Sequence, residues 1–428
     1  MTPCDAVDST IRPPGSKSIT NRALVCAALA EGRSHLSGVL DSEDTQVMIA
    51  AWRKLGIDVE QDLAAGEVVL QGCGGRIAHD DIHLDVGNSG TTIRFLTAAL
   101  AACGGHYVLN GVPRMRERPI GDLLRGLQQL GCTVSSRNAQ RPDCPPVEID
   151  SQGMAGGRAE VAGNISSQYL SGLMLAAPLA ARDVLLEVSG ELVSTPYVDM
   201  TSAVMRSFGA EVRGPAAGPL HIPAPMKYQG TRYTIEPDAS AASYFWGAAA
   251  ITGGRARVEG LSRSSLQGDV AFCDVLQKMG CDVLYGDDFI EVQGHALQGL
   301  EIDMGHISDT VQTLAAVALF AAGPTIVRGV AHNRVKETDR ISDLARELER
   351  LGATVEEFPD GLAIHPAARI AAAEIETYHD HRMAMSLALV GLRATGIVIL
   401  DPACTAKTYP GYWQDLQLFS GSRIERLD

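Results

Sequence analysis

The stretch LGIDV, residues 55–59, ends an amphipathic segment with a glycine and then continues with alternating apolar residues. The same ending recurs along the chain, as LGCTV from residue 130, FGAEV from 208, MGCDV from 279, LGATV from 351 and, in degenerate form, LFSG from 418. Each glycine can supply the left-handed conformation that ends a helix, and the β-branched residue after it favours a strand. Because these glycines stand 69 to 78 residues apart, the pattern predicts six α/β repeats.

Each predicted repeat also contains a second helix, which is rich in alanine and apolar on nearly every side. The six segments read ITNRALVCAALAEG, TTIRFLTAALAACGG, SSQYLSGLMLAAPLAARD, SAASYFWGAAAITGG, DTVQTLAAVALFAAG and HRMAMSLALVGLRATG. A helix that is hydrophobic all round is buried, so we expect these six in the interior. Alternating stretches such as GEVVLQG (66–72) and FIEVQG (289–294) predict strands.

The length of the chain, 428 residues, exceeds the size at which a single hydrophobic core stops growing, so we expect two domains. Three repeats in each domain is the simplest division. The chain would cross between the domains near PAPMKYQG, residues 223–230, where proline and glycine interrupt the periodicity.

Composition restricts the partners and the compartment. A net charge of −15 would repel nucleic acid and anionic membrane surfaces, so we expect neither as a partner. The start MTPCDAVDST lacks the features of a signal peptide, and no apolar run approaches the roughly 18 residues of a membrane span. The nine cysteines have no metal-site spacing, which predicts reduced, mostly buried thiols and no metal. We expect a cytoplasmic monomer without a cofactor.

Polar residues are concentrated at the starts of the six apolar helices. These starts read GSKSITNR, GNSGTTIR, NISSQYL, PDASAAS, ISDTVQT and YHDHRM. The first resembles the end of a phosphate-binding loop, but Thr10 replaces the earlier glycine and Ser16 precedes the lysine. A helix start favours anions, whereas Ser, Thr, Asn and Asp also occur there as N-caps. For PDASAAS, capping is the favoured interpretation.

Capping does not account for the cations in and near these starts. They are Lys17, Arg22, Arg94 and Arg382, with Arg114, Arg116, Arg118, Lys336, Arg340 and Lys407 in other Gly- or Pro-marked stretches. Arginine suits carboxylate and lysine suits phosphate, so we predict a pocket for a substrate with several negative groups. Asp309 and Glu337 lie among these cations; each is a candidate acid or base, and a structural ion pair is the alternative.

Several of these motifs together resemble the 5-enolpyruvylshikimate-3-phosphate synthase family. They are PPGSKSITNRAL, GNSGTTIRFL, RMRERPIGDLL, SSQYLSGL, LVSTPYVDMT, NRVKETDR, DHRMAM and CTAKTYPG, in this order from about residue 11 to residue 413. GSKSITNR and NRVKETDR are specific individually, whereas SSQYL alone would be weak.

The resemblance implies a fold as well as an activity. Each domain would be an inside-out α/β barrel of three βαββαβ-like repeats, with helices buried and sheets facing outward. One domain would span residues 13–227 and the other residues 1–12 plus 228–428, with the active site in the cleft between them. The implied reaction transfers the enolpyruvyl group of phosphoenolpyruvate to the 5-hydroxyl of shikimate 3-phosphate, in the pathway to chorismate and aromatic amino acids.

The resemblance also implies binding residues for both substrates. Shikimate 3-phosphate would bind its phosphate, carboxylate and ring hydroxyls through Lys17, Ser18, Arg22, Ser166, Ser167, Gln168, Ser194, Tyr197, Asp309, Asn333 and Lys336. Phosphoenolpyruvate would bind through Lys17, Gly90, Arg118, Gln168, Arg340, Arg382 and Lys407. The implied catalytic residues are Glu337 at carbon, Asp309 at the 5-hydroxyl, and Lys17 in contact with both reactants.

One motif departs from the family pattern. Plant and enteric members read GNAGTAMRPL where this chain reads GNSGTTIRFL, with Ser89, Thr92 and Phe95 as replacements. Gly90 is kept, so the backbone can still approach a phosphate closely. The herbicide glyphosate occupies the phosphoenolpyruvate site in the family, and this helix shapes that site.

Three other functions fit parts of the sequence. UDP-N-acetylglucosamine enolpyruvyl transferases use the same donor but carry a reactive cysteine in a loop, where this chain reads RMRERPIG (114–121). RNA 3′-terminal phosphate cyclases share part of the architecture, but an acidic chain without basic stripes argues against RNA. A non-catalytic anion-binding protein would not need both Asp309 and Glu337 beside the cations.

Overall fold

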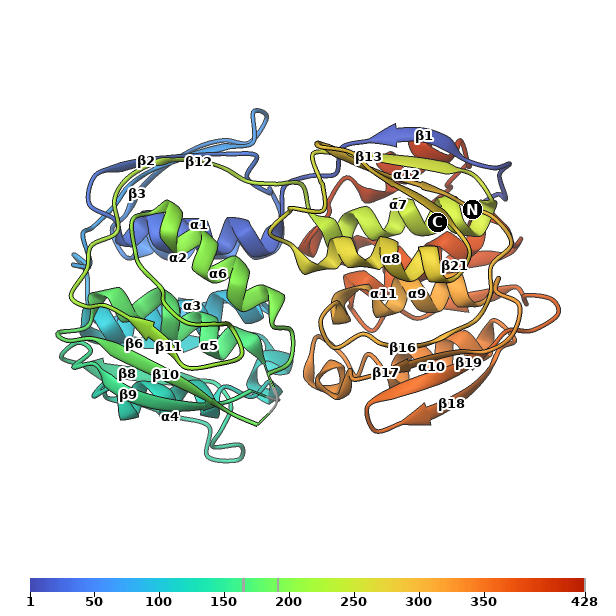
Figure 1. Ribbon diagram of the computed structural model, residues 1–428. Helices are drawn as coiled ribbons and strands as arrows, with labels where there is room; N and C mark the ends of the chain where they lie inside the picture. Colours follow the sequence, from blue (N-terminus) through green and yellow to red (C-terminus); the bar gives the residue numbers. More distant parts are fainter. Residues whose placement is uncertain (164–165, 191, 427–428) are drawn as a thin grey trace. The chain divides into compact units, whose positions relative to one another are not determined.

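The computed structural model describes residues 1–163, 166–190 and 192–426, so Asn164 and Ile165, which open the stretch NISSQYL, lie outside the described residues. The fold is of the α/β class, and the chain divides into two compact units (Figure 1). The N-terminal unit is Gly15–Ile235, and the C-terminal unit is Met1–Pro14 with Glu236–Asp428.

Strand pairing explains where the chain divides. We predicted boundaries after residues 12 and 227, whereas the units separate after Pro14 and Ile235. Strand β12 (Arg232–Thr234) pairs in parallel with β2 (Arg33–Ser37), which keeps the residues up to Ile235 in the N-terminal unit. Strand β1 (Asp8–Ile11) pairs in parallel with β13 (Arg255–Glu259) of the C-terminal unit.

The N-terminal unit contains three sheets, with the strand orders β12-β2-β4-β3, β5-β6-β8-β7 and β11-β10-β9. The remaining strands are β3 (Asp58–Asp62), β4 (Glu67–Gln71), β5 (Ile82–Asp85), β6 (Gly105–Asn110), β7 (Val134–Ser136), β8 (Val147–Ser151), β9 (Gly157–Ala162), β10 (Val184–Ser189) and β11 (Leu220–Ile222). In both four-stranded sheets the first strand pairs in parallel and the other two pairings are antiparallel.

The C-terminal unit repeats this pattern, with the strand orders β1-β13-β15-β14, β16-β17-β19-β18 and β20-β21. Its remaining strands are β14 (Asp282–Tyr285), β15 (Phe289–Gln293), β16 (Glu301–Asp303), β17 (Thr325–Arg328), β18 (Thr354–Phe358), β19 (Gly361–His365), β20 (Ala373–Ile375) and β21 (Ile397–Ile399). Its four-stranded sheets have the same one parallel and two antiparallel pairings. This shared topology confirms the structural repeat for the four-stranded sheets. Among the described residues, the third sheet has three strands in the N-terminal unit and two in the C-terminal unit.

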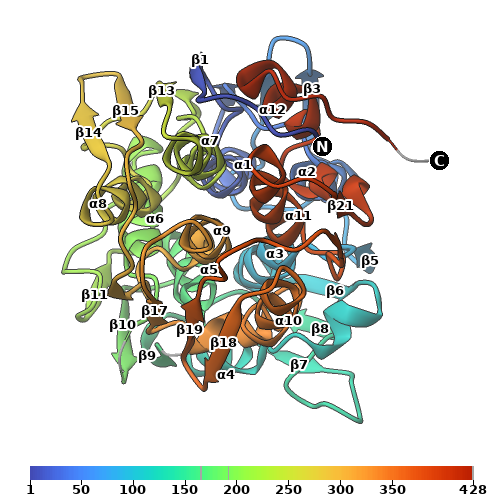
Figure 2. The ribbon, with the colours of Figure 1, turned by 90° about the vertical axis from the view of Figure 1, so that its right-hand side faces the viewer.

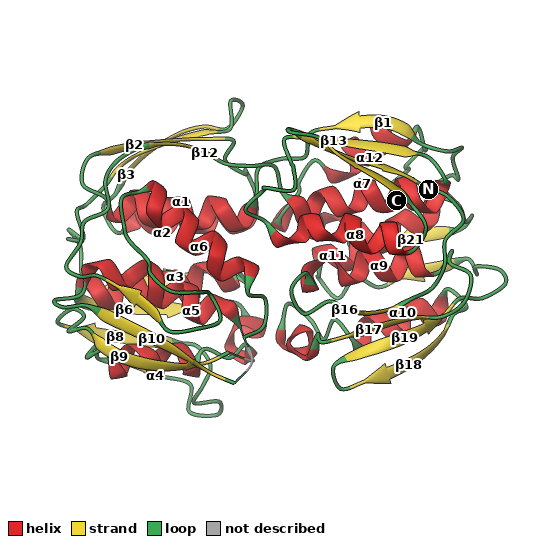
Figure 3. Cartoon of the chain, in the orientation of Figure 1, coloured by secondary structure: helices red, strands yellow, loops and turns green. Residues whose placement is uncertain are grey.

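The six apolar helices are buried, as predicted. They are α1 (Lys17–Leu29), α3 (Gly90–Cys103), α5 (Ser167–Ala176), α7 (Ala239–Thr252), α9 (Val311–Ala318) and α11 (His381–Ala388). Every residue of α7 is buried. Figure 2 shows α7, α9 and α11 within the strands of the C-terminal unit, and Figure 3 shows the strands of each unit outside its apolar helices.

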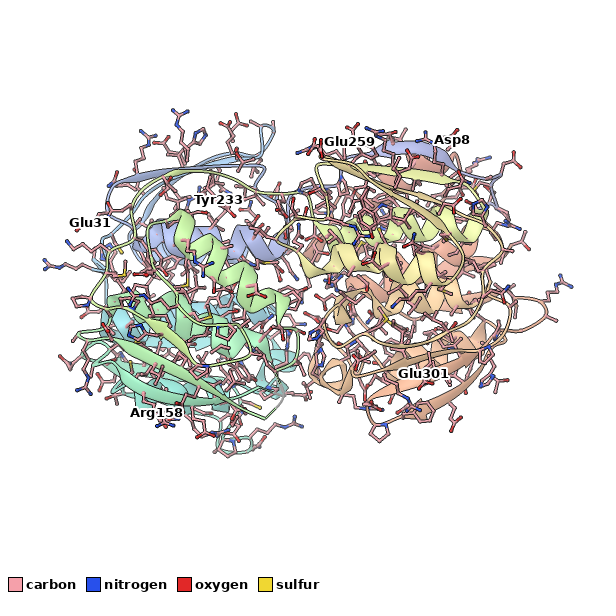
Figure 4. The ribbon with its side chains drawn as sticks, viewed as in Figure 1. Asp8, Glu31, Arg158, Tyr233, Glu259 and Glu301 are labelled. Atoms are coloured by element: carbon pink, nitrogen blue, oxygen red, sulfur yellow. The ribbon has the colours of Figure 1, made fainter. Side chains whose placement is uncertain are left out.

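The sheets face outward with their polar side chains. Burial alternates along strands such as β4 and β13, which is the pattern of a sheet with one solvated face. Figure 4 shows Asp8 on β1 and Arg158 on β9 pointing away from the helices of their units. No sheet among the described residues closes into a barrel.

The repeated glycines end the amphipathic helices. These helices are α2 (Glu43–Lys54), α4 (Gly121–Gln129), α6 (Pro196–Ser207), α8 (Phe272–Lys278), α10 (Ser342–Arg350) and α12 (Tyr412–Ser420). The glycine that follows has a positive φ in all six, from +66° at Gly421 to +113° at Gly280, which confirms the predicted left-handed ends.

The strand expected after FGAEV does not form. Only an isolated bridge joins Arg213 to His221, because the stretch GPAAGP (214–219) intervenes and its prolines cannot donate hydrogen bonds. The 3₁₀ helices are η1 (Pro113–Glu117), η2 (Ala177–Leu179), η3 (Gly268–Ala271), η4 (Ser308–Thr310), η5 (Ala331–Val335), η6 (Leu389–Leu392) and η7 (Pro402–Lys407). Across the described chain, no helix has the length and apolar character of a membrane span.

The helix-ending glycines give a direct test of the repeat. Gly209 has a φ of +84°, and a Cβ added there would lie 3.4 Å from Gln229 Cγ, so the space suffices and only the backbone conformation is unfavourable. We expect Gly209→Ala to lower the free energy of unfolding by about 1 to 2 kcal/mol, measured by chemical denaturation. Gly209→Asn is the control and should lose less, because asparagine tolerates this conformation. An alanine variant as stable as the wild type would contradict the assignment.

Candidate active site

The polar starts of the buried helices are N-caps in five of the six cases. Ser16, Ser89, Ser166, Asp238 and Asp380 each accept a hydrogen bond from a backbone N–H in the first turn of the following helix. The capping interpretation of PDASAAS is therefore correct. Capping does not explain the charged residues of these helix starts. They form one group in each unit.

Arg22 is buried inside the N-terminal unit among neutral groups. Its guanidinium donates to Thr201 Oγ1 at 2.7 Å, to the Ser18 carbonyl at 2.8 Å and to Ser171 Oγ at 3.2 Å. It also lies 5.1 Å from the centre of the Phe95 ring, one of the residues that depart from the family pattern. Burial lowers the pKa of Arg22 to about 10, so it keeps its positive charge at neutral pH.

Three further residues predicted to bind substrate, Lys17, Ser194 and Tyr197, also belong to the N-terminal unit. Lys17 opens α1, and its Nζ lies 3.6 Å from Asp44 Oδ2 of α2. The backbone carbonyl of Tyr197 accepts a hydrogen bond from the Arg22 guanidinium at 3.4 Å. Ser194 is buried and has a φ of +56°, a left-handed conformation that is unusual for serine. Such strain is concentrated at functional sites.

Arg94 links the starts of α3 and α5. Its guanidinium donates to the Gly90 carbonyl and to Gln168 Oε1, both at 3.0 Å, and to the Pro119 carbonyl at 2.9 Å. A Cβ added at Gly90 would lie 2.6 Å from both Arg94 Nη1 and Arg118 Nη2. A larger residue there would displace the ends of both arginine side chains, so glycine lets the two guanidinium groups lie close to the backbone of this helix start.

Arg118 and the serines complete the N-terminal cluster, by which we mean Lys17, Ser18, Arg22, Gly90, Arg94, Arg118, Ser166, Ser167, Gln168, Ser194 and Tyr197. Arg118 is buried and donates to the Asn88 carbonyl at 3.0 Å. Ser166 caps α5 through the Gln168 N–H at 3.2 Å, and Ser167 is the buried first residue of that helix.

Asp309 is the centre of a second group, in the C-terminal unit. Its Oδ1 lies 2.7 Å from Lys336 Nζ and 3.2 Å from Arg340 Nη1, and its Oδ2 lies 2.7 Å from Arg382 Nη2. Burial alone would raise the pKa of Asp309, but these three cations hold it well below its usual range. Asp309 is therefore ionised at neutral pH.

Glu337 shares Arg340 with Asp309. Glu337 Oε2 lies 2.9 Å from Arg340 Nη2, and Oε1 lies 3.2 Å from Lys407 Nζ. Arg340 is only 1% exposed and is also held by Asp380, with its Nε 2.6 Å from Asp380 Oδ2. Burial would lower the pKa of Arg340, but Asp380, Glu337 and Asp309 raise it. We call Asp309, Asn333, Lys336, Glu337, Arg340, Asp380, Arg382 and Lys407 the C-terminal cluster.

Asn333 joins this cluster through the backbone. It is completely buried, and its amide donates to the Ser308 carbonyl at 3.1 Å. The neighbouring His332 contacts the Ser308 hydroxyl at 2.8 Å. Burial, and to a smaller extent the positive charge of Lys336, lowers the pKa of His332 to about 3. His332 is therefore neutral. Both side chains hold Ser308 beside Asp309.

Two of the predicted cations lie on η1, and one carboxylate partner was missed. Arg116 is exposed and donates to Asn110 Oδ1, and Arg114 pairs with Glu117 at 2.9 Å. Their part in an anion pocket stays a prediction. Asp380 was not selected, although its place before the charged start of α11 was the available signal. Arg94 was noted only as a charge, whereas the structure shows it bridging two helix starts.

The cysteines and the search for metal ligands add two findings. All nine cysteines are free, and five of them (Cys26, Cys132, Cys144, Cys273 and Cys281) are buried, which confirms the prediction of reduced, mostly buried thiols. Within residues 1–163, 166–190 and 192–426, no group of three or more His, Cys, Asp and Glu residues has the arrangement of a metal site.

Comparison with known proteins gives one consistent result. Residues 1–416 match the profile of the family described as EPSP synthase (3-phosphoshikimate 1-carboxyvinyltransferase). A protein of that second name from Nostoc punctiforme is 50% identical over 408 residues, which are 95% of each chain. Its counterpart from Erwinia tasmaniensis is 46% identical and covers 98% of each chain.

More distant relatives agree. The chloroplastic 3-phosphoshikimate 1-carboxyvinyltransferase of Brassica napus is 45% identical over 97% of this chain and 84% of its own. A solved structure of EPSP synthase from Acinetobacter baumannii is similar with a TM-score of 0.81 at 27% identity, covering 98% of this chain and 97% of that one. Since both the full-length sequence match and the fold agree, the chain belongs to the EPSP synthase family.

Proposed function

We propose that this chain, a 3-phosphoshikimate 1-carboxyvinyltransferase by family, uses its two clusters as one active site for shikimate 3-phosphate and phosphoenolpyruvate. It transfers the enolpyruvyl group to the 5-hydroxyl of shikimate 3-phosphate and releases phosphate, in the shikimate pathway. The observation that carries the proposal is that one buried guanidinium, Arg340, contacts both candidate acid–base residues, Asp309 and Glu337.

The N-terminal cluster is proposed to hold shikimate 3-phosphate by its anionic groups. Ser166, Ser167 and Ser194 would donate to the phosphate, with Tyr197 beside them, and Ser18 and Arg22 would bind the carboxylate. The neutral surroundings of Arg22 support this role, because its charge is not cancelled by a carboxylate among its described partners. Gln168 would reach the ring hydroxyls, together with Asp309, Asn333 and Lys336 of the other cluster.

Phosphoenolpyruvate is proposed to bind through cations of both clusters. Its phosphate would contact Lys17, the Gly90 N–H, Arg118 and Lys407, with Gln168 nearby, and its carboxylate would contact Arg340 and Arg382. Support comes from the C-terminal cluster, where four cations (Lys336, Arg340, Arg382 and Lys407) outnumber three carboxylates (Asp309, Glu337 and Asp380). The net positive charge favours a further anion.

The chemistry follows from this arrangement. Protonating the methylene carbon of phosphoenolpyruvate makes the neighbouring carbon electrophilic, and the 5-hydroxyl adds there as Asp309 accepts its proton. The tetrahedral intermediate then loses phosphate and a proton from the new methyl group, which restores the double bond. Glu337 is proposed to give and take the proton at carbon, while Lys17 and the other cations stabilise the departing phosphate.

The finer architecture and the cellular setting belong to the same proposal. We infer an inside-out α/β arrangement with three βαββαβ-like repeats per domain and the active site in the interdomain cleft, supported by the three sheets and three buried helices of each unit. Both clusters come from one chain, so the site needs no second copy and a monomer suffices. Nine free thiols suit the cytoplasm, which is reducing.

Phosphate release tests the activity itself. The protein incubated with shikimate 3-phosphate and phosphoenolpyruvate should release inorganic phosphate, and omitting either substrate should abolish the signal. Release from phosphoenolpyruvate alone would indicate a phosphatase and would contradict the transferase assignment.

Ser167→Ala tests the phosphate site. Losing one hydrogen bond to a charged group costs roughly 1.5 to 3 kcal/mol, so the affinity for shikimate 3-phosphate should fall by about 10- to 150-fold, and phosphoenolpyruvate binding should change less. Isothermal titration calorimetry measures both. Ser207→Ala is the control, because Ser207 is exposed on α6 and, within the described part of the chain, bonds only to the Ala203 carbonyl of its own helix. Unchanged affinity in Ser167→Ala would remove this residue from the site.

Glu337→Gln tests proton transfer at carbon. The amide keeps the shape of the side chain, and its one oxygen can still accept from either Lys407 or Arg340. Both substrates should therefore bind while kcat falls by about 10²- to 10⁴-fold. Exchange of the methylene hydrogens of phosphoenolpyruvate with solvent, with both substrates present, should slow by a similar factor. Glu347→Gln is the control for a structural role, because Glu347 is buried and paired with Arg350 at 3.3 Å. Wild-type exchange in Glu337→Gln would move the carbon acid to another group, with Lys17 as the next candidate.

Asp309→Asn separates the two carboxylates. Asp309 is proposed both to bind and to activate the 5-hydroxyl, so its variant should lower kcat and also weaken shikimate 3-phosphate binding. The loss of charge would also leave Lys336, Arg340 and Arg382 short of a partner. Steady-state kinetics with each substrate varied should show a raised KM for shikimate 3-phosphate. A loss confined to kcat would contradict the binding role.

A further inference from the structure

A further buried carboxylate, Asp269, lies near the C-terminal cluster and has no role in the chemistry proposed above. Asp269 belongs to η3 and is 4% exposed. The Ser240 hydroxyl donates to its Oδ2, whereas its Oδ1 has no hydrogen-bond partner among the described residues. An ionised carboxylate that is buried with one oxygen unsatisfied is costly, so this environment favours the protonated form.

The start of α7 fixes Asp269 in this position. Ser240 is the second residue of α7, and Asp238 caps the same helix through the Ala241 N–H at 2.9 Å. Gln267, two residues before Asp269, accepts from the Ala239 N–H at 2.9 Å and donates to the Pro237 carbonyl at 2.6 Å. The carboxyl group is therefore held against the start of α7 by its own contact with Ser240 and by the two hydrogen bonds of Gln267.

The charged groups that act on Asp269 come from three other segments. They are Asp309 in η4, Arg382 in α11 and Asp238 before α7. Burial, followed by the charge of Asp309, raises the pKa of Asp269 to about 7, while Ser240 and Arg382 oppose this shift. Asp309 stays ionised because three cations surround it. When two carboxyl groups interact in this way, one holds the proton and the other stays ionised; here Asp269 holds it.

We propose that Asp269 is a positioning residue that holds a proton beside the C-terminal cluster. Asp309 can then be ionised while Asp269 stays neutral, so no second negative charge weakens the attraction of the cluster for anions. The inference rests on the function proposed for this cluster. When Asp269 releases its proton to solvent, it adds one negative charge near Arg382, a residue proposed to bind the carboxylate of phosphoenolpyruvate. Anion binding should then weaken as the pH rises above neutrality.

A direct titration of the carboxyl group tests the proton-holding role without substrates. Aspartate labelled with ¹³C at the side-chain carboxyl is incorporated, and the resonance that disappears in Asp269→Asn is assigned to Asp269. Its midpoint should lie near pH 7 in the wild type and should fall in Asp309→Asn, because the charge that raises it is removed. A midpoint near the ordinary value of about 4, or no change in Asp309→Asn, would overturn the proposal. Failure of the transferase activity would leave this titration unaffected.

Phosphoenolpyruvate binding tests the consequence for the site. Calorimetry compares the phosphoenolpyruvate affinity of the wild type with that of Asp269→Asn, which mimics the protonated form at every pH. The ionisation of phosphoenolpyruvate itself affects both proteins equally and cancels in the ratio of the two affinities. The ratio should be near one at pH 6, and by pH 8 the wild type should bind more weakly, by at most about tenfold per pH unit. A ratio that does not change with pH would overturn the proposal. If Asp269→Asn fails to fold, Asp269→Glu supplies the assignment, because residue 269 then no longer contributes a labelled aspartate resonance. The titration in the wild type and Asp309→Asn then decides the question.

Discussion

A buried guanidinium needs hydrogen-bond partners, and Arg340 has three carboxylates as partners. It lies within 3.2 Å of Asp309, Glu337 and Asp380, which come from η4, the segment before α10 and the start of α11. Removing an ion from water costs several kcal/mol unless it is well paired. The pairing therefore fixes three separate segments around one charge, and the two carboxylates proposed to move protons take their positions from it.

The repeat architecture explains why charged groups gather at the starts of buried helices. Each repeat surrounds an apolar helix with strands, and the charged side chains of these helices lie in their first two turns. The N-terminal unit uses neutral partners for Arg22, namely hydroxyls and backbone carbonyls. The C-terminal unit instead pairs its cations with carboxylates. The first arrangement suits holding an anion and the second suits moving protons beside one.

Much of the fold could be predicted because its signals are local. A glycine such as Gly56 or Gly352 ends a helix through its own backbone conformation, and the apolar sequence of α7 requires burial whatever surrounds it. The strand missing after Gly209 also depends on local residues, the prolines of GPAAGP, which the repeat pattern obscured. The order of strands in each sheet depends on contacts between distant segments, which periodicity does not encode.

The candidate site was predictable to a smaller extent. The motifs identified the cations, and the structure brings Lys336, Arg340 and Arg382 onto Asp309. The pairing of Arg340 with Asp380, 40 residues later, is a tertiary contact without a spacing rule. Arg114 and Arg116 resembled pocket cations because they share a stretch with Arg118, yet only Arg118 is buried. Side-chain direction within a 3₁₀ segment was not evident from the sequence.

The central proposal is that the two clusters bind different groups of one shikimate 3-phosphate molecule. A crystal structure of the protein with shikimate 3-phosphate tests it most directly. The account predicts that the phosphate contacts Ser166, Ser167 and Ser194 while the ring hydroxyls of the same molecule contact Asp309 and Lys336. A ligand that contacts only one of the two clusters would contradict it.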